Sequence, residues 1–402
     1  MNYWHIQMHP ANQEEFGRKE VTRILTETGY IGVGEWNEGA GKIRQFKDEV
    51  QKNDIVLVRS KGPLALVEII GDAEYEEYAR DGIDWFENRR KVKILAWHND
   101  DLKNQLGRTV DGIFNTNSFA SANKSHYIKS WHQLLLNERM ENEVAELLKS
   151  KFQVVLQGPP GTGKTRLARL VAEKLVTEQA DMKLIQFHPA YAYEDFVRGI
   201  VAETNEAGHI EYRVENKVLG EFASRAAAAD DGRFFVLIID EINRANLPSV
   251  LGELIYALEY RGEQVESVYG VGEAKNRSLM LPKNLLIIGT MNTADRSVGH
   301  LDYAIRRRFA FVTVLPNAMV VPEGAGRDLF EAVEALFVKP YLSNEFQPEQ
   351  VQPGHSYFIT SEDEGWSLPQ KLEFEIKPLL REYLKDGILL AAAREKIEDL
   401  RA

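Results

Sequence analysis

The chain has 402 residues, of which 44% are hydrophobic and 27% charged, the balance of a globular protein with two or three domains. It has no cysteine, which excludes disulfides, thiolate zinc sites and cysteine nucleophiles. The formal net charge of −12 argues against a generally basic nucleic-acid binder, although a local basic groove on such a chain can still hold DNA. No apolar run approaches the ~20 residues that span a bilayer. The N-terminus has no signal pattern, so we expect a cytoplasmic protein with no membrane partner.

The first part of the chain predicts a compact β-rich module. The β-branched runs predict short strands, and one apolar stretch has helical spacing and ends at Gly29. The predicted strands are 54–59, 65–70 and 92–97, the helix is 18–28, and a linker rich in Asn, Ser, Thr and Gly lies at 107–124. We therefore predict a first domain over residues 1–131, built as a small barrel and including this linker.

Residues 132–315 alternate apolar strands with amphipathic helices. The predicted strands are 153–156, 184–187, 234–239 and 285–289, and the predicted helices are 165–176, 193–199, 248–260 and 301–307. Such alternation implies a parallel sheet covered by helices on both faces, which is a three-layer α/β domain. Residues 316–402 carry few strand signals and predict a small helical lid.

A glycine-rich loop lies between the first predicted strand of this α/β domain and the helix that follows. Its spacing is that of a Walker A loop, in which backbone N–H groups and a helix N-terminus bind phosphates. We expect Lys164 to reach the β- and γ-phosphates and Thr165 to give its hydroxyl to Mg²⁺. The predicted phosphate-binding residues are Gly158, Pro159, Pro160, Gly161, Thr162, Gly163, Lys164 and Thr165.

Two further strands end in polar side chains. The strand at 234–239 runs into Asp240 and Glu241, which is the form of a Walker B motif. Asp240 is expected to hold Mg²⁺ through water, and Glu241 is expected to polarise the attacking water. The strand at 285–289 leads to Asn292, in the place where AAA+ proteins carry a polar sensor that orients this water. The order of the motifs resembles that of the AAA+ family.

The helix at 301–307 runs into three consecutive arginines, Arg306, Arg307 and Arg308. In a ring of AAA+ subunits this helix end faces the neighbouring nucleotide, where an arginine stabilises charge on the γ-phosphate. Cations also stabilise the C-terminus of a helix, and this simpler role applies to at least one of the three. We expect Arg306 or Arg307 to be the finger, because Arg308 abuts the next strand.

The segment from Met291 to Ser297 resembles the signature of the McrB family, the motor subunits of modification-dependent restriction systems. Further segments of the same family lie in the expected order, and the resemblance covers about Val154 to Tyr383. Those segments are 187–188, 193–196, 240–246, 301–309 and 354–358.

The resemblance to the McrB family implies GTP as the preferred nucleotide, a homo-hexameric ring, and a partner endonuclease of the McrC type. It also implies recruitment of that nuclease to DNA with modified bases. Within the signature, Asn292 carries over as the sensor, and Asp295 and Arg296 as structural or partner-facing parts of the active site. The sequence has no guanine-reading motif, so the choice of GTP over ATP rests on the resemblance.

The front module resembles the EVE and YTH-like branch of PUA-type barrels, through residues 31–36, 52–60 and 66–70. Such folds hold a flipped modified base between aromatic walls. The resemblance places Trp36 in a cage wall, with Arg59 and Ser60 at the pocket rim. The alternative is that the tryptophans of this module belong to its core, as aromatic residues of small barrels usually do. Whether the module binds DNA or RNA stays open.

The leading hypothesis is therefore a GTP-hydrolysing motor that reads modified DNA and activates a partner nuclease. The chain itself shows no convincing nuclease motif. One alternative is an ATP-driven remodeller of proteins or RNA–protein complexes. Another is a modified-base binding protein whose motor only switches its state of assembly.

Overall fold

The computed structural model describes residues 1–8, 17–34, 40–76, 86–106, 119–205, 208–229, 231–295, 302–360 and 365–402. The chain divides into two compact units, Met1–Arg139 and Met140–Ala402. The helix α4 (His126–Lys151) begins before the boundary predicted at residue 131 and ends beyond the division at Arg139. Among the described helices, none combines the length and the apolar character that crossing a bilayer requires.

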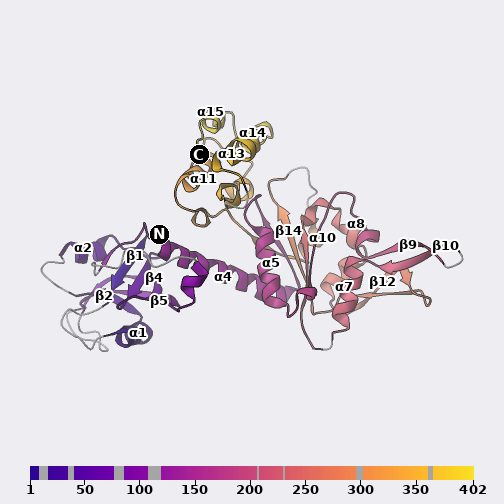
Figure 1. The fold of residues 1–402 in the computed structure, drawn as a ribbon, viewed down its shortest axis with the longest axis horizontal. Coiled ribbons are helices and arrows are strands. Elements are labelled where there is room, and N and C mark those ends of the chain that lie inside the picture. Colours follow the sequence, from indigo (N-terminus) through magenta and orange to yellow (C-terminus); the bar gives the residue numbers. More distant parts are fainter. Residues whose placement is uncertain are drawn as a thin grey trace. The chain divides into compact units, whose positions relative to one another are not determined.

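The first unit is built on one six-stranded sheet in the order β2-β5-β4-β3-β1-β6 (Figure 1). The strands are β1 (Tyr3–Gln7), β2 (Tyr30–Val33), β3 (Ile55–Arg59), β4 (Pro63–Tyr75), β5 (Asn88–Trp97) and β6 (Phe119–Ser121). Its helices are α1 (Arg18–Glu27), α2 (Ala40–Asp48) and α3 (Leu102–Leu106). The predicted β-rich module is therefore confirmed, as an open half-barrel in which β2 and β6 are the edges.

The core of this half-barrel forms where alternate strand residues meet the two longer helices. Trp4 stacks on Phe119 with ring centroids 5.3 Å apart, and its indole nitrogen donates to Asp54 at 2.9 Å. This tryptophan is a core residue, whereas Trp97 at the end of β5 is 39% exposed. Trp36 and Trp85 lie outside the described residues.

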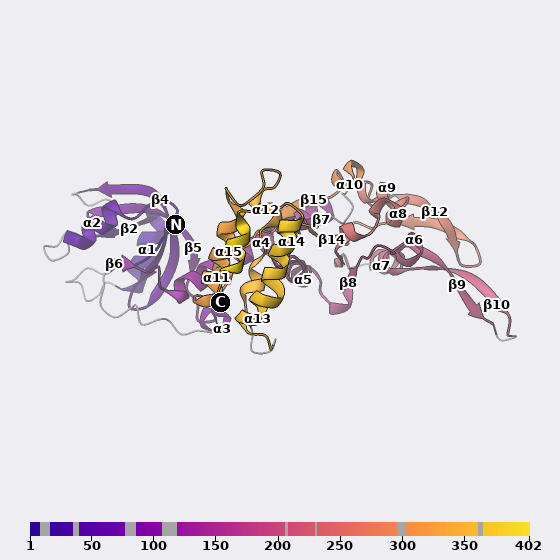
Figure 2. The ribbon, with the colours of Figure 1, turned by 90° about the horizontal axis from the view of Figure 1, so that it is seen from above.

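The second unit contains a five-stranded parallel sheet in the order β15-β7-β14-β11-β8 (Figure 2). The strands are β7 (Gln153–Gly158), β8 (Met182–Gln186), β11 (Phe235–Asp240), β14 (Leu285–Asn292) and β15 (Ala310–Thr313). The α/β prediction is confirmed, and each predicted strand lies within two residues of an observed one at its start. The strand order sets β7, β14 and β11 side by side, so the three predicted motifs end at one edge of the sheet.

Alternate residues of the central strands pack in opposite directions, which produces three layers. On one face, Val154, Val236 and Ile288 pack against α4 and α5 (Lys164–Leu175). On the other face, Val155 and Leu237 pack against a second helical layer. That layer consists of α6 (Tyr193–Phe196), α7 (Val218–Ala227), α8 (Leu247–Leu251) and α9 (Leu254–Glu259).

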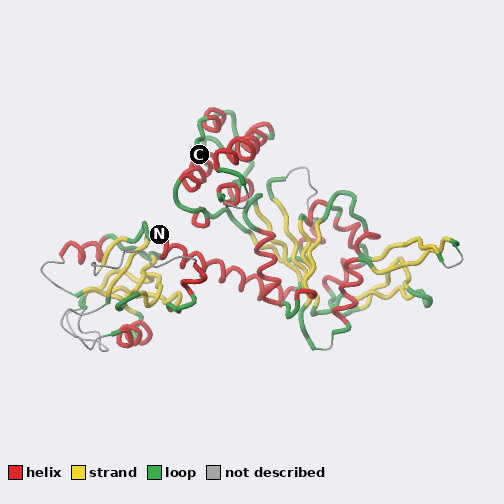
Figure 3. Tube along the Cα trace, in the orientation of Figure 1, coloured by secondary structure: helices red, strands yellow, loops and turns green. Residues whose placement is uncertain are grey.

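Two antiparallel hairpins interrupt the alternation, and the sequence did not predict them (Figure 3). The helix predicted at 193–199 ends at Phe196, and β9 (Arg198–Thr204) and β10 (Ile210–Asn216) follow it. The second hairpin, β12 (Gln264–Val271) with β13 (Asn276–Met280), precedes β14. The helix predicted at 248–260 is likewise two helices, because Gly252 takes φ 52° and ψ −128° between α8 and α9.

The helical lid is confirmed by a separate apolar core that includes Leu329, Phe330, Leu380 and Ile397. Its α-helices are α11 (Ala325–Glu334), α12 (Pro348–Val351), α13 (Leu368–Lys371), α14 (Lys377–Lys385) and α15 (Ala393–Glu398). A π-helical turn at Leu372–Ile376 joins α13 to α14, and the 3₁₀ turn η7 (His355–Phe358) precedes them.

Candidate nucleotide-binding and hydrolysis site

The phosphate-binding loop connects β7 to α5. Gly161 and Gly163 have φ values of 78° and 81°, a left-handed conformation that glycine adopts without strain. Lys164 is 7% exposed, and its Nζ donates to the carbonyl oxygens of Gly158 and Pro159 at 3.1 and 2.7 Å. Burial lowers the pKa of Lys164 to about 8, although Glu241 and Asp240 oppose this shift. The loop therefore places a buried cation at the N-terminus of a helix, which suits a polyphosphate.

The predicted metal-binding pair is brought together by the parallel register of the sheet. Thr165 Oγ1 donates to Asp240 Oδ1 at 2.7 Å, and Thr290 Oγ1 donates to the same oxygen at 2.5 Å. A hydroxyl and a carboxylate oxygen this close supply the hard ligands that Mg²⁺ prefers. The residues present therefore fit a magnesium ion. Thr290 was missed by the sequence, because its role depends on the register of β14 against β11.

Glu241 lies between two polar neighbours at the end of β11. Asn292 Nδ2 donates to Glu241 Oε1 at 2.6 Å, and Arg244 Nε lies 3.2 Å from Glu241 Oε2. Arg244 Nη2 also lies 3.3 Å from Asp295 Oδ2. The predicted Asn292 and Asp295 thus join Glu241 in one cluster, while Arg296 lies outside the described residues. Arg244 links Glu241 to Asp295, and no motif in the sequence had given it that role.

The three consecutive arginines differ in their surroundings at the end of α10 (Tyr303–Arg306). Arg308 has a side chain only 9% exposed, which donates to the Ala304 carbonyl and pairs with Glu259 at 2.9 Å. Arg307 is 64% exposed and pairs with the same carboxylate at 3.1 Å. The Arg306 guanidinium lies 5.2 Å from the ring centroid of Phe311. Arg308 thus has a structural role, and the finger assignment to Arg306 or Arg307 stays a prediction.

The lid contacts the phosphate-binding loop through the start of η7. Gly354 N donates to the Pro160 carbonyl at 2.8 Å, and Ser356 N donates to the Gly161 carbonyl at 3.0 Å. A Cβ atom on Gly354 would lie 2.0 Å from the carbonyl carbon of Gly161, so only glycine fits there. Burial, with a contribution from Arg166, lowers the pKa of the neighbouring His355 to about 4.

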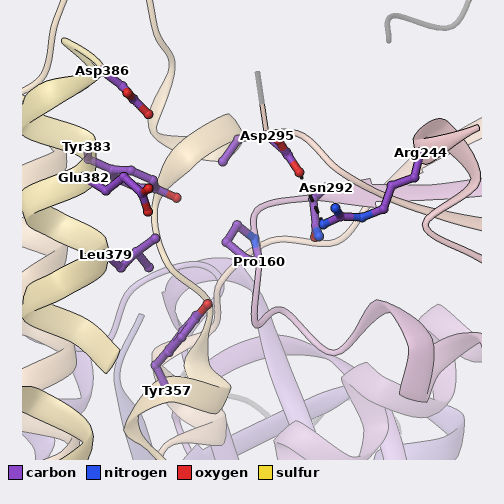
Figure 4. A pocket seen from close by; sticks show the side chains of 10 residues that line it. Pro160, Arg244, Asn292, Asp295, Tyr357, Leu379, Glu382, Tyr383 and Asp386 are labelled. Atoms are coloured by element: carbon purple, nitrogen blue, oxygen red, sulfur yellow. Dashed lines mark ion pairs between the residues drawn. The ribbon is translucent and has the colours of Figure 1, made fainter. Parts of the chain in front are cut away.

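A pocket of about 620 Å³ lies between the end of β14 and the lid (Figure 4). The large domain contributes Pro160, Arg244, Asn292 and Asp295, and the close view shows the Arg244 guanidinium directed at Asp295. The lid contributes Tyr357, Leu379, Glu382, Tyr383 and Asp386. The pocket therefore opens at the end of the loop where the terminal phosphate of a bound nucleotide is expected.

The first unit carries the predicted base-pocket residues on β3 and directly after it. Arg59 and Ser60 are each 3% exposed, so both are buried in the described unit, and their place at the rim of a base pocket stays a prediction. His5 on β1 is 2% exposed, and within the described residues His5 Nδ1 and Ser60 Oγ have no hydrogen-bond partner. Burial, Arg59 and Lys42 lower the pKa of His5 to about 4. Trp36, the predicted aromatic wall, lies outside the described residues.

Comparisons with known proteins agree with the motifs of the second unit. The family model described as "AAA domain (dynein-related subfamily)" matches residues 153–309. The Type IV methyl-directed restriction enzyme EcoKMcrB subunit of Escherichia coli strain K12 is 35% identical over 277 residues, 63% of this chain and 59% of that protein. The Type II restriction enzyme BsuMI component YdiS of Bacillus subtilis strain 168 is 31% identical over 190 residues, 39% of this chain and 55% of that protein.

The chain thus spans less than two thirds of the length of either relative. Among solved structures, NtrX from Brucella abortus is similar over 66% of this chain and 68% of that one. The two chains are 12% identical, with a TM-score of 0.30.

Proposed function

Because the chain is an McrB-like AAA+ protein of restriction systems, we propose that it hydrolyses GTP and thereby drives a partner endonuclease on DNA with modified bases. The observation that carries the proposal is the convergence of Thr165, Asp240, Glu241 and Asn292 beside the phosphate-binding loop. Nucleoside triphosphatase activity follows from this family and this constellation. GTP as substrate, modified DNA and the partner follow from the resemblance to McrB.

Each residue of the site has its own role in the proposed hydrolysis. Thr165 and Asp240 would hold Mg²⁺, which when bound neutralises charge on the β- and γ-phosphates. Lys164 neutralises phosphate charge from the other side of the loop. Glu241 accepts a hydrogen bond from the attacking water and aligns it, and Asn292 fixes the direction of the Glu241 carboxylate. In a homo-hexameric ring, Arg306 or Arg307 of a neighbouring subunit adds a cation at the γ-phosphate.

DNA recognition is assigned to the first unit. Ser60 Oγ and His5 Nδ1 are buried polar atoms that lack a partner within the described residues, and groups of this kind suit the hydrogen-bonding edge of an extruded base. Arg59 adds a buried cation beside them. Trp36 would supply the stacking surface. The proposal is that this site selects DNA carrying a modified base, and that an McrC-type subunit then cleaves it.

The decisive experiment is steady-state hydrolysis of GTP and of ATP by the purified chain. Each is measured alone, with methylated duplex DNA, and with a candidate McrC-type partner. GTP-selective turnover that the partner accelerates supports the proposal. ATP-selective turnover that the partner does not change would favour the alternative function, an ATP-driven remodeller of proteins or RNA–protein complexes. The first unit would then be tested for binding to RNA and to peptides. Slow turnover that nothing accelerates would favour a binding protein that only switches its assembly.

A further inference from the structure

The turn η7 of the lid fits closely against the phosphate-binding loop. A Cβ atom on Gly161 would lie 2.7 Å from the Tyr357 ring and 2.8 Å from Ser356 Oγ, and Gly354 leaves no space for a Cβ atom either. The two segments therefore meet backbone to backbone, and the two hydrogen bonds between them hold this arrangement. Such a fit fixes the place of the side chain that lies between Gly354 and Ser356, which is His355.

The His355 ring reaches the last glycine of the loop. Its Nε2 lies 3.6 Å from the position that a Cβ atom on Gly163 would take. Gly163 comes directly before α5, and the backbone N–H groups of such a loop bind the α- and β-phosphates of a nucleotide. His355 Nε2 therefore lies next to the place where these two phosphates are expected.

The His355 ring has no hydrogen bond among the described residues, and its Nδ1 is buried. Burial, with a smaller contribution from Arg166, lowers the pKa of His355 to about 4, so the ring is neutral near pH 7. A neutral imidazole has one nitrogen that donates and one that accepts. Because Nδ1 is enclosed without an acceptor, the N–H is assigned to Nε2, which faces the loop. His355 thus presents an unused donor to the phosphate-binding loop.

The surroundings of this donor favour an anion. Arg166, the third residue of α5, is exposed and forms no ion pair within the described part of the chain. Its charge acts on the His355 ring, as the lowered pKa of His355 shows. A cation and an N–H donor therefore lie near Gly163, at the N-terminus of a helix, and neither has an acceptor among the described residues. Phosphate oxygens are acceptors that suit both.

We propose that His355 binds the nucleotide from the lid, by donating a hydrogen bond from Nε2 to an oxygen of the α- or β-phosphate. This inference rests on the proposed hydrolytic function and deepens it, because it adds a lid residue to the binding site. The γ-phosphate is expected elsewhere, beside Pro160 and Asn292 at the pocket (Figure 4). Triphosphate and diphosphate therefore hold the lid equally, and product release requires η7 to leave the loop.

Binding measured by isothermal titration calorimetry tests the contact. The ligands are GDP, a non-hydrolysable GTP analogue and inorganic pyrophosphate. We expect His355→Ala to weaken the binding of all three by about 10-fold, because a hydrogen bond to a charged acceptor is lost. His355→Gln should stay within about 3-fold of the parent, since its amide nitrogen can replace Nε2. His355→Asn, with its nitrogen nearer to the place of Nδ1, should bind as weakly as His355→Ala.

The matched control is His209→Ala, an exposed histidine in the turn between β9 and β10, which should bind all three ligands as the parent does. The Tm of each variant without nucleotide is measured as well, so that affinities are compared only between folded chains. A second readout is the dissociation of a fluorescent GDP analogue. It should be faster in His355→Ala than in the parent, because the lid no longer retains the product.

Equal affinity of the parent and His355→Ala would overturn the proposal. A loss confined to the GTP analogue would overturn it in favour of a contact with the γ-phosphate. A loss for GDP without a loss for pyrophosphate would overturn it in favour of the ribose or the base. Equally weak binding by the Gln and Asn variants would show that His355 acts through packing alone. A parent chain that binds no nucleotide would instead refute the proposed function itself.

Discussion

Glu241 holds its backbone in an unfavourable conformation. Its φ is 54°, in the left-handed region that residues other than glycine rarely adopt, and Thr290 Oγ1 accepts its backbone N–H at 3.2 Å. Such strain persists where the surrounding contacts determine the conformation, and it is frequent at active sites. The strain places the carboxylate against Asn292 and Arg244, where it is ready to align a water molecule.

The first prediction concerns this carboxylate. Glu241→Gln keeps the size of the side chain and a hydrogen bond with Asn292, but removes the charge that polarises water. We expect nucleotide binding to persist and turnover to fall about 100-fold or more, the usual range for a lost general base. Nucleotide affinity and steady-state hydrolysis measure the two effects. Hydrolysis at the parent rate would show that another residue activates the water.

The second prediction concerns His5. Its folded pKa of about 4 lies below the ordinary value of 6.5, so the unfolded chain binds more protons between these pH values. The free energy of unfolding should therefore fall as the pH falls from about 6.5 to about 4, by at most about 3 kcal/mol. His5→Asn should remove this part of the pH dependence. The free energy of unfolding in urea is measured for parent and variant, and the difference between them isolates the contribution of His5 from that of His355. A difference that stays constant between about pH 4 and 6.5 would refute this prediction.

Sequence spacing predicted the site residues whose position follows from a motif. Asp240 and Asn292 stand at strand ends, and Lys164 and Thr165 begin the helix α5 after the loop that follows β7; parallel strands bring these positions to one edge of the sheet. Thr290 and Arg244 could not be predicted in this way, because their contacts depend on register and on the turn after Glu241. At the arginine cluster, the sequence separated Arg308 from the other two because it abuts the next strand, and its buried pairing with Glu259 agrees with this.

At the scale of elements, the strands of the large sheet were predictable because they are continuous apolar runs. The hairpins were not, because β9 and β10 mix apolar with charged residues and leave Ile210 and Tyr212 65% and 74% exposed. Helical and extended patterns are hard to separate in such short segments. The break at Gly252 was missed for a different reason. Gly252 has a φ of 52° and packs beside Tyr193, a residue distant in the sequence, whose ring carbons would lie 3.2 Å from a Cβ atom on Gly252.

The third prediction concerns the contact between η7 and the phosphate-binding loop. Gly354→Ala would put a Cβ atom 2.1 Å from the Gly161 carbonyl oxygen and 2.3 Å from Thr162 N, so the two segments must separate. We expect nucleotide affinity to fall about 10-fold or more, which corresponds to at least about 1.4 kcal/mol. Gly41→Ala, in open space on α2, is the control and should leave affinity unchanged. Equal affinity for both variants would show that this contact does not shape the loop.

At the scale of the whole molecule, the proposed arginine from another copy would make the site work only after assembly. The fourth prediction is that turnover per subunit rises with protein concentration, together with the molar mass from light scattering. Glu241→Gln should assemble as the parent does, and Arg306→Gln should assemble without the rise in turnover. Turnover per subunit that is the same at every concentration would mean that each chain hydrolyses nucleotide alone.

The two hairpins are joined by side chains as well as by the backbone. Arg198 on β9 donates to Asn216 and to the carbonyl oxygens of Tyr269, Asn276 and Ser278, so it binds both hairpins at once. Tyr193 adds hydrogen bonds to Glu253 and Ser267 at 2.5 and 2.8 Å.

In mechanical terms, these bonds join the two hairpins into one unit, which Tyr193 connects to Glu253 at the break between α8 and α9. The break at Gly252 comes directly after α8, which is the first α-helix after Glu241 in the chain. A displacement of the start of α9 would therefore be transmitted to both hairpins, because Tyr193 connects Glu253 to β12 and Arg198 connects β9 to β12 and β13.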